Sequence, residues 1–224
     1  MRLVFASNNA HKLDEVRAIM PAGIDVLSLR DIGFEAEIAE TGTTLEENSR
    51  IKAHAVYQWL RVTGYRLPID GVFADDTGLE IDALGGKPGV YTARWYLFND
   101  GMSAALPLND EMMVFAANRK KALRELEGKT DRGAQFRTVI TLIRFKSTDR
   151  FQVDLSVQRT DIQVEGVVRG RIATEEYGEG GFGYDPVFIP EGYDKTFGEL
   201  PAEVKNGISH RSRALAALVK TLNG

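Results

Sequence analysis

The sequence predicts an α/β fold built around a mixed β-sheet, and three observations support this class. Short apolar runs typical of buried strands are interspersed with longer segments whose apolar residues recur at helical spacing. The two kinds of segment do not alternate strictly, as they would in a fully parallel sheet. Of the 224 residues, 43% are hydrophobic, which is enough for a substantial core. Because no repeat or linker interrupts the chain, we expect a single domain over residues 1–224.

The N-terminal half begins with a predicted strand at residues 3–6 and a helix whose apolar residues are Leu13, Val16, Ile19 and Met20. A second helix is predicted from about 45 to 61, because Thr44 and Glu47 have the spacing of a capping box. Two strands should follow, at about 71–75 and 79–83, separated by a turn at Thr77 and Gly78.

The C-terminal half should contain a helix over 110–126 that ends before Gly128. Strand-like runs follow near 136–145, 151–158 and 162–168, the second with a clean alternation of apolar and polar residues. The last helix starts after Ser209 and should bury Leu215, Leu218, Val219 and Leu222.

Composition excludes several classes of function. The net charge is −4, and no block of like charge indicates a nucleic-acid or membrane surface. The chain contains no cysteine, which rules out disulfides and thiolate chemistry. No apolar run approaches a membrane-spanning length, and the first residues turn polar too soon for a signal peptide. We therefore expect a cytoplasmic protein.

The most informative motif is the pair Asp75 and Asp76, which ends the apolar run 72–74. Adjacent residues at the end of a strand point to opposite sides, so one carboxylate can hold a metal ion while the other faces a water molecule. Carboxylates suit Mg²⁺, which proteins usually hold through one or two carboxylates and the phosphates of a substrate. An acidic turn between two strands is the simpler explanation of the pair alone.

A lysine lies on the apolar face of the second predicted helix. At about 100° per residue, Asn48 and Lys52 share one arc with Leu45, Ile51, Ala55, Val56, Trp59 and Leu60. A lysine on such a face is rarely buried unless it is paired, although it can also extend to solvent from the edge. A functional Lys52 would point toward Asp75, Asp76 and Glu40 and contact phosphate oxygens.

Three further segments favour a nucleotide-phosphate site. Residues 7–12 follow a strand and open a helix, where free N–H groups suit a phosphate, although an ordinary capped helix has the same pattern. In residues 180–186 an aromatic side chain, Phe182 or Tyr184, can stack on a base and Asp185 can accept from a ring N–H. Residues 205–211 place donors and positive charge at the start of the last helix.

With these segments in order, the chain resembles the house-cleaning nucleoside triphosphate pyrophosphatases that act on inosine and xanthosine triphosphates. The matching segments run nearly from end to end: Ser-Asn-Asn-Ala-His-Lys at 7–12, Glu-Thr-Gly at 40–42, Glu-Asn at 47–48 with Lys52, Ala-Asp-Asp-Thr-Gly-Leu-Glu at 74–80, residues 85–94, residues 180–188 and Lys-Asn-Gly-Ile-Ser-His-Arg at 205–211. Residues 95–118 look longer than is usual in the family.

The resemblance implies an elongated α/β fold with two lobes around a central mixed sheet and flanking helices, and a homodimer. It implies Mg²⁺-dependent hydrolysis of ITP, dITP and XTP to the monophosphate and pyrophosphate. By matching position, Asp76 is the general base, Glu40, Asp75 and Asp76 surround the metal, and Lys52 assists catalysis. The remaining implied substrate contacts are Ser7, Asn8, Asn9, Ala10, His11, Lys12, Asn48 and Thr77, with Phe182, Gly183, Tyr184, Asp185, Lys205, His210 and Arg211 around the base.

A site with a donor such as Arg211 or His210 aimed at the 6-oxo group of the purine would be left unpaired against adenine, which carries a 6-amino donor. Two alternatives remain open. One is a related pyrophosphatase acting on modified pyrimidine nucleotides or on dTTP and UTP, and the other is a non-catalytic nucleotide sensor. The carboxylates at 75 and 76 argue against a sensor, because a protein that only binds needs no group that activates water.

Overall fold

The computed structural model describes residues 1–65, 68–98, 110–145 and 160–223. The chain forms two compact units, each assembled from separate stretches of sequence. The first unit comprises residues 1–76, 138–166 and 211–224, and the second comprises residues 77–137 and 167–210.

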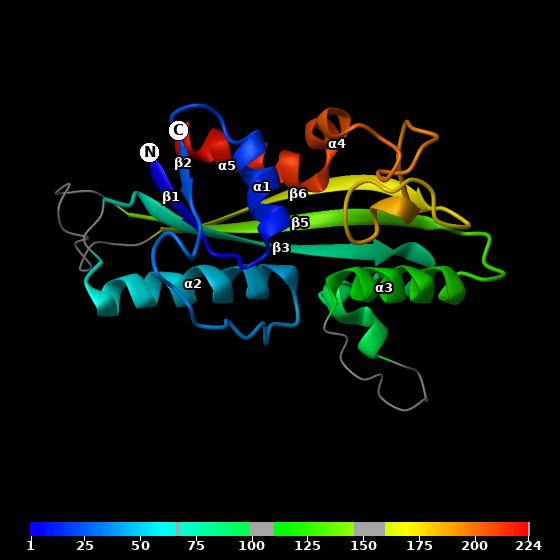
Figure 1. Cartoon of the computed structure of the whole chain (residues 1–224), viewed down its shortest axis with the longest axis horizontal. Coiled ribbons are helices and arrows are strands. Elements are labelled where there is room, and N and C mark those ends of the chain that lie inside the picture. The colour runs from blue at the N-terminus through cyan, green and yellow to red at the C-terminus, as the bar shows by residue number, and fades with distance from the viewer. Residues whose placement is uncertain (66–67, 99–109, 146–159, 224) are drawn as a thin grey trace. The chain divides into compact units, whose positions relative to one another are not determined.

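The strands belong to one mixed sheet, which confirms the predicted class (Figure 1). They are β1 (Arg2–Phe5), β2 (Asp25–Leu27), β3 (Gly71–Ile81), β4 (Lys87–Gly89), β5 (Gly133–Arg144), β6 (Thr160–Ile172) and β7 (Phe188–Pro190). Their order is β2-β1-β3-β5-β6-β7, with β4 paired to β3. Strand β1 runs parallel to β2 and β3, whereas β4 is antiparallel to β3 and β7 is antiparallel to β6.

The helices are α1 (Ala10–Ile19), α2 (Leu45–Thr63), α3 (Glu111–Glu125), α4 (Ala202–Ile208) and α5 (His210–Asn223). Three short 3₁₀ turns accompany them: η1 (Asp82–Leu84), η2 (Thr92–Leu97) and η3 (Asp185–Val187). The predicted helices at 45–61 and 110–126 and the helix after Ser209 are therefore confirmed to within about two residues. Within the described ranges no helix combines the length and the apolar character needed to cross a membrane.

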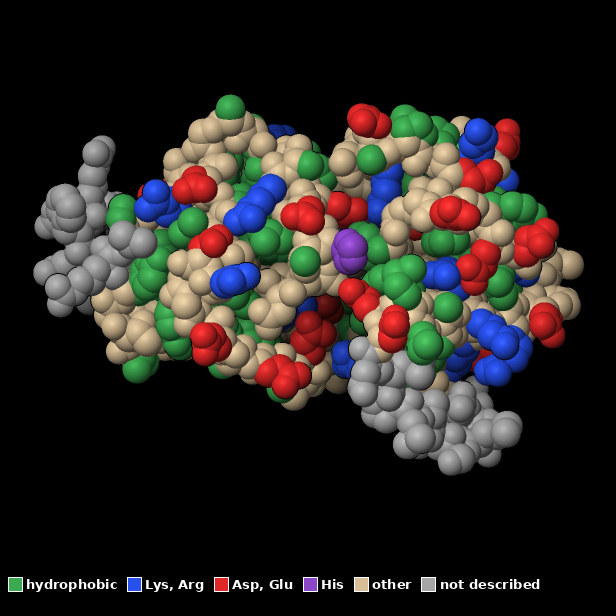
Figure 2. Space-filling view, viewed as in Figure 1, with side chains coloured by type: hydrophobic (Ala, Val, Ile, Leu, Met, Phe, Trp, Pro, Cys, Tyr) green, Lys and Arg blue, Asp and Glu red, His purple; other side chains and the backbone are tan. Residues whose placement is uncertain are grey.

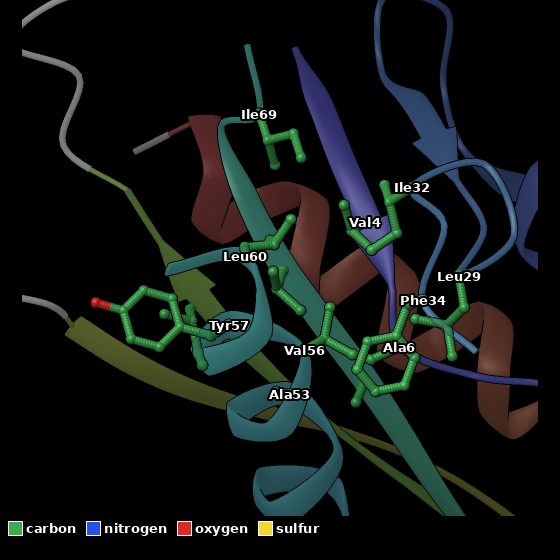
Figure 3. Packing of buried hydrophobic residues seen from close by; sticks show 13 residues of the cluster. Val4, Ala6, Leu29, Ile32, Phe34, Ala53, Val56, Tyr57, Leu60 and Ile69 are labelled. Carbon is green, nitrogen blue, oxygen red and sulfur yellow. The ribbon is translucent and has the colours of Figure 1, made fainter. Parts of the chain in front are cut away.

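In the first unit, helices cover both faces of the sheet because the side chains of β1 alternate between the faces. Val4 and Ala6 pack against the apolar stripe of α2, which contributes Ala53, Val56, Tyr57 and Leu60 (Figure 3). Leu3 and Phe5 point the other way, into a cluster with Val16 of α1 and with Ala214, Leu215, Leu218 and Leu222 of α5. The predicted core residue Val219 of α5 is only partly buried.

The second unit has its own core. Leu79 and Ile81 of β3 belong to a cluster that includes Ala122 of α3 and Leu126, the residue after its end. The rings of Phe136, Phe188 and Phe197 continue this cluster, with centroids 4.8 and 5.4 Å apart. On the visible face of the molecule, acidic and basic side chains are intermingled (Figure 2).

The expected turn at Thr77 and Gly78 is wrong, because β3 continues without a break from Gly71 to Ile81. Each end of this strand has its own partner: residues 71–73 pair with β1 and residues 79–81 pair with β4. Pairing at both ends keeps the intervening backbone extended. The three-residue strands β2, β4 and β7 and the short helix α4 were not predicted, because so few residues carry no periodicity. The alternating run at 151–158 lies outside the described residues.

We expect Gly170→Ala to lower the free energy of unfolding by about 1–3 kcal/mol, the usual cost of overpacking. A Cβ at Gly170 would lie 2.2 Å from the carbonyl oxygen of Ile189 and 2.7 Å from the ring of Phe188, on the neighbouring strand β7. The matched control is Gly207→Ala in α4, where a Cβ meets nothing within 4 Å, and this variant should gain about 0.5–1 kcal/mol. Urea denaturation measures both, and equal effects would contradict the packing of β6 on β7.

Candidate active site

Asp75 and Asp76 of β3 bind different cations in the first unit. Asp75 Oδ1 lies 3.0 Å from Lys12 Nζ, and Asp75 Oδ2 lies 3.3 Å from Arg211 Nε. Asp76 Oδ1 lies 3.0 Å from Lys52 Nζ. The prediction that the adjacent carboxylates point to opposite sides of the strand is therefore confirmed.

Asp75 belongs to a largely buried network of ion pairs, here called the ionic lock, whose other members are Lys12, Arg211 and Glu15. Arg211, the second residue of α5, also donates to Glu15 of α1, so one guanidinium joins two carboxylates. Burial by itself raises the pKa of Asp75, but the Lys12 and Arg211 cations outweigh it and hold that pKa well below its usual range. Asp75 therefore stays ionised and links the starts of α1 and α5 to β3.

Lys12 reaches Asp75 from the first turn of α1. Asn9 caps this helix, since its Oδ1 accepts from the backbone N–H of Lys12 at 2.9 Å. Ser7 Oγ accepts from the N–H of Asn9 at 3.3 Å. Asn8, Ala10 and His11 are exposed around this helix N-terminus, where the helix dipole favours an anion. Burial lowers the pKa of Lys12, and Asp75 offsets this only in part.

Lys52 is buried on the apolar face of α2 and is paired, which favours a functional lysine over one that extends to solvent. Its Nζ donates to Asp76 Oδ1 at 3.0 Å and to Glu40 Oε1 at 2.7 Å. Burial by itself lowers the pKa of Lys52, but the two carboxylates raise it above its ordinary value. Burial raises the pKa of Asp76, and the Lys52 cation offsets this only in part. Asp76 is thus a more basic carboxylate than its neighbour Asp75.

Residues 40–44 are held against the start of α2 by a variant of the predicted capping box. Thr44 Oγ1 accepts from the N–H of Glu47 at 3.1 Å, and the Glu47 carboxylate also accepts from the N–H of Thr43, one residue before the cap. Gly42 allows this close approach, because a Cβ there would lie 2.6 Å from Glu47 Cβ. This packing fixes the segment that carries Glu40.

Among the described residues of the first unit, two buried side-chain atoms have no hydrogen-bond partner, Asp76 Oδ2 and Asn48 Nδ2. The Asn48 amide has a fixed orientation, since its Oδ1 accepts from the N–H of Gly42 at 2.8 Å. A buried polar group left unpaired costs about 1–3 kcal/mol. Asp76 Oδ2 is an acceptor and suits a bound cation, whereas Asn48 Nδ2 is a donor and suits an oxygen atom of a ligand.

The predicted metal ligands Glu40, Asp75 and Asp76 form ion pairs with two separate sets of basic side chains. Asp76 and Glu40 share Lys52, whereas both oxygens of Asp75 accept from cations. Over the described parts of the chain, no set of three or more histidine, cysteine or acidic side chains is arranged to hold a metal ion by itself. The buried Asp76 Oδ2 is nevertheless the kind of hard oxygen that Mg²⁺ binds, and substrate phosphates usually supply further ligands.

A second cluster, in the second unit, surrounds Phe182. Asp185 Oδ2 accepts from the N–H of Phe182 at 2.7 Å and from Lys205 Nζ at 2.8 Å. Lys205 Nζ also lies 4.7 Å from the centroid of the Phe182 ring, a cation–π distance. Gly181 adopts φ 75°, and a Cβ there would collide with the Asp185 carboxylate, so the loop requires glycine.

The other predicted residues of this unit are anchors of the loop or members of the core. Tyr184 is buried and donates from its hydroxyl to the carbonyl of Thr92 at 3.1 Å, and burial raises its pKa. Of the two predicted stacking residues, only Phe182 is partly exposed. His210 is buried and stacks on Phe136 at 4.8 Å between centroids. Thr77 and Gly183 are partly buried.

Sequence reasoning missed Glu15, Arg119 and Phe115. Glu15 follows Lys12 by three residues, a spacing that places both on one face of α1. Arg119 donates to the carbonyl of Gly183 at 2.9 Å, and the ring of Phe115 lies 6.2 Å from that of Phe182. No sequence signal marks these two residues, because their partners are more than 60 residues away.

We expect Asp75→Asn and Asp76→Asn to differ sharply in stability. Asp75→Asn leaves Lys12 and Arg211 buried beside a neutral amide and should cost about 3–5 kcal/mol. Asp76→Asn should change the free energy of unfolding by less than about 1 kcal/mol, because folding already disfavours the charge of Asp76 and Lys52 keeps Glu40. Urea denaturation at neutral pH measures both, and similar losses would contradict the ionic lock at Asp75.

Comparison with known proteins shows which family the chain belongs to. The model of the Ham1 family matches residues 3–221. A relative from Flavobacterium johnsoniae, named dITP/XTP pyrophosphatase, is 40% identical and is aligned over 99% of this chain and 98% of its own length. A relative of the same name from Bacillus subtilis is 42% identical, with 98% and 96% covered.

Solved structures of similar proteins have the same fold. The Ham1 protein of Staphylococcus aureus superposes with a TM-score of 0.74 at 35% identity and covers 100% of this chain and 99% of its own. A HAM1 protein from Coxiella burnetii gives a TM-score of 0.73 at 33% identity, with 100% and 98% covered. Since the family model and relatives above 30% identity both span nearly the whole sequence, the chain belongs to the Ham1 family.

Proposed function

We propose that this protein hydrolyses the non-standard purine nucleoside triphosphates ITP, dITP and XTP to the monophosphate and pyrophosphate, with Mg²⁺, and so removes them from the nucleotide pool. Relatives that align over nearly the whole chain bear the name dITP/XTP pyrophosphatase. The observation that carries the proposal is Asp76, whose Oδ1 is held by Lys52 while its buried Oδ2 has no hydrogen-bond partner.

The triphosphate is bound by groups of the first unit. Ser7, Asn8, Asn9, Ala10, His11 and Lys12 form the N-terminus of α1, where backbone N–H groups and the helix dipole attract phosphate oxygens. Asn48 donates its unpaired N–H to an oxygen of the substrate, which removes the cost of burying that donor. Lys12 and Lys52 stabilise the charge that builds up on the phosphates during the reaction.

Asp76 is the general base. Its Oδ2 takes a proton from a water molecule as the water oxygen attacks the α-phosphorus, and the bond from that phosphorus to the oxygen bridging it to the β-phosphorus breaks. Pyrophosphate leaves with the electron pair of that bond. Burial raises the pKa of Asp76, which makes it a stronger base than an exposed carboxylate, while Lys52 fixes its orientation.

Glu40, Asp75 and Asp76 are the residues proposed to hold Mg²⁺. Asp76 and Glu40 both bind Lys52, so their carboxylates lie side by side. Asp75 is engaged with Lys12 and Arg211, so its part is to be nearby negative charge more than to be a ligand. When bound, Mg²⁺ neutralises charge on the phosphates and lowers the barrier to attack.

The purine base is recognised by residues of the second unit. The ring of Phe182 stacks on the base, and the surrounding residues Gly183, Tyr184, Asp185, Lys205, His210 and Thr77 shape and line the base and sugar sites. A donor aimed at the 6-oxo group favours hypoxanthine and xanthine over adenine. The sequence led us to expect that Arg211 contributes to this selectivity for 6-oxo purines. In the first unit Arg211 also donates to Asp75 and Glu15 and is therefore part of the ionic lock.

Two further expectations remain proposals. The homodimer rests on the family resemblance, and the cytoplasmic setting follows from where the proposed substrates occur. A pyrophosphatase for pyrimidine nucleotides and a nucleotide sensor are the competing functions, and the substrate experiment distinguishes them.

We expect the purified protein to convert ITP, dITP and XTP to the monophosphate and pyrophosphate. With ITP in water enriched in ¹⁸O, mass spectrometry should find one label per IMP and none in pyrophosphate, because water attacks the α-phosphorus. Label in pyrophosphate would contradict attack at that atom, and release of orthophosphate with a diphosphate would contradict the reaction itself.

The controls in this experiment address the alternatives and the metal. Faster hydrolysis of dTTP or UTP than of ITP would favour the pyrimidine enzyme, and binding of ITP without turnover would favour the sensor. Excess chelator should abolish turnover and added Mg²⁺ should restore it. Full activity in chelator would contradict the proposed role of Glu40 and Asp76 as metal ligands.

A further inference from the structure

Arg119 connects helix α3 to residues 180–184, which are called the Phe182 loop. Arg119 Nη1 donates to the carbonyl of Gly183 at 2.9 Å, and its Nε lies 2.9 Å from a carboxylate oxygen of Glu176, which precedes the loop. That second contact is an ion pair without hydrogen-bond alignment. The Arg119 side chain is 12% exposed, so α3 holds the loop at two points through one largely buried cation.

Phe115 supports the same loop from the same face of α3. It precedes Arg119 by four residues, the spacing of one helical turn, and its ring lies 6.2 Å from that of Phe182 at an angle of 44°. Lys205 lies on the Phe182 ring at 4.7 Å. The orientation of Phe182 is therefore set by a cation on its ring and by a second aromatic ring from α3.

Helix α3 is itself fixed within the second unit. Asn118 accepts from the N–H of Tyr96 at 2.8 Å and donates to the carbonyl of Ala93 at 3.0 Å. Lys121 is buried and donates to the carbonyls of Trp95 and Phe98. Helix α3 thus binds η2 through Asn118 and Lys121. It contacts the Phe182 loop through Arg119 and Phe115. Because α3 is held by η2, it can hold the loop in a fixed position.

We propose that Arg119 and Phe115 are positioning residues that set the affinity for the purine base by holding Phe182 and the Gly183 peptide in their binding geometry. This inference rests on the proposed function, because it assigns to α3 the role of holding the base-binding loop in its conformation. Neither residue touches the phosphates in this account. Loss of either contact therefore weakens the base interaction and spares the chemistry at Asp76.

The kinetic consequence is specific. An interaction with the base is equally strong in the ground state and in the transition state, so its loss raises KM and leaves kcat nearly unchanged. Arg119→Met, which keeps an unbranched side chain but removes the guanidinium, should raise KM for ITP about tenfold or more, the scale of one lost charge-assisted hydrogen bond. Phe115→Leu should raise KM about threefold and tests the inference should Arg119→Met fold poorly.

The test compares ITP with inorganic pyrophosphate, which has no base. In Arg119→Met and Phe115→Leu, KM for ITP should rise, whereas the inhibition constant of pyrophosphate against ITP hydrolysis should stay within about twofold of the wild-type value. A parallel rise of both constants, or a fall of kcat larger than the rise of KM, would overturn the inference. Arg119→Lys, which keeps a cation, should recover part of the affinity.

Arg132→Met is the matched control, since Arg132 also donates to backbone carbonyls in the second unit, those of Ile172, Leu126 and Ala173, none of which belongs to the Phe182 loop. It should lower the melting temperature and leave KM for ITP unchanged. If the wild-type protein does not hydrolyse ITP, the proposed function fails. If the wild type is active and both α3 variants keep its KM, only the role of α3 is wrong.

Discussion

The structure of the first unit depends on how β3 presents two adjacent carboxylates. Because successive side chains of a strand point to opposite faces, Asp75 and Asp76 form their ion pairs with different basic side chains, which offsets the cost of burying each carboxylate. Lys12 and Arg211 serve Asp75, and Lys52 serves Asp76. Three helices, α1, α2 and α5, are thereby fixed by charge to the strand on which they also pack.

The two carboxylates have different electrostatic surroundings, which suit Asp75 to a structural role and Asp76 to a catalytic one. Two cations hold the pKa of Asp75 well below its usual range, so it stays ionised and holds structure together. Asp76 has one direct cation, which Glu40 shares, and burial raises its pKa. A carboxylate with a fixed oxygen, an unpaired oxygen and a raised pKa has the properties of a general base.

Local patterns in the sequence were sufficient for several parts of this arrangement. The start of α1 after residues 7–9, the start of α2 after Thr44 and the position of Lys52 on the apolar face of α2 follow from residues within one or two helical turns. The alternation rule placed Asp75 and Asp76 on opposite sides of β3. Contacts between distant residues could not be predicted this way, and Arg211 is the example: the sequence marked it for the base, but its partner Glu15 is 196 residues away. The continuity of β3 likewise depends on its partners β1 and β4 and not on Thr77 and Gly78 themselves.

The division of labour between Asp75 and Asp76 is the central claim, and the turnover of Asp76→Asn with ITP tests it most directly. The amide keeps an oxygen for Lys52 but cannot take a proton from water. The account predicts that kcat falls at least about 100-fold, the scale of lost general-base catalysis, while calorimetry still detects ITP binding. A variant that keeps kcat within about threefold of the wild-type value would contradict the assignment of Asp76 as the base.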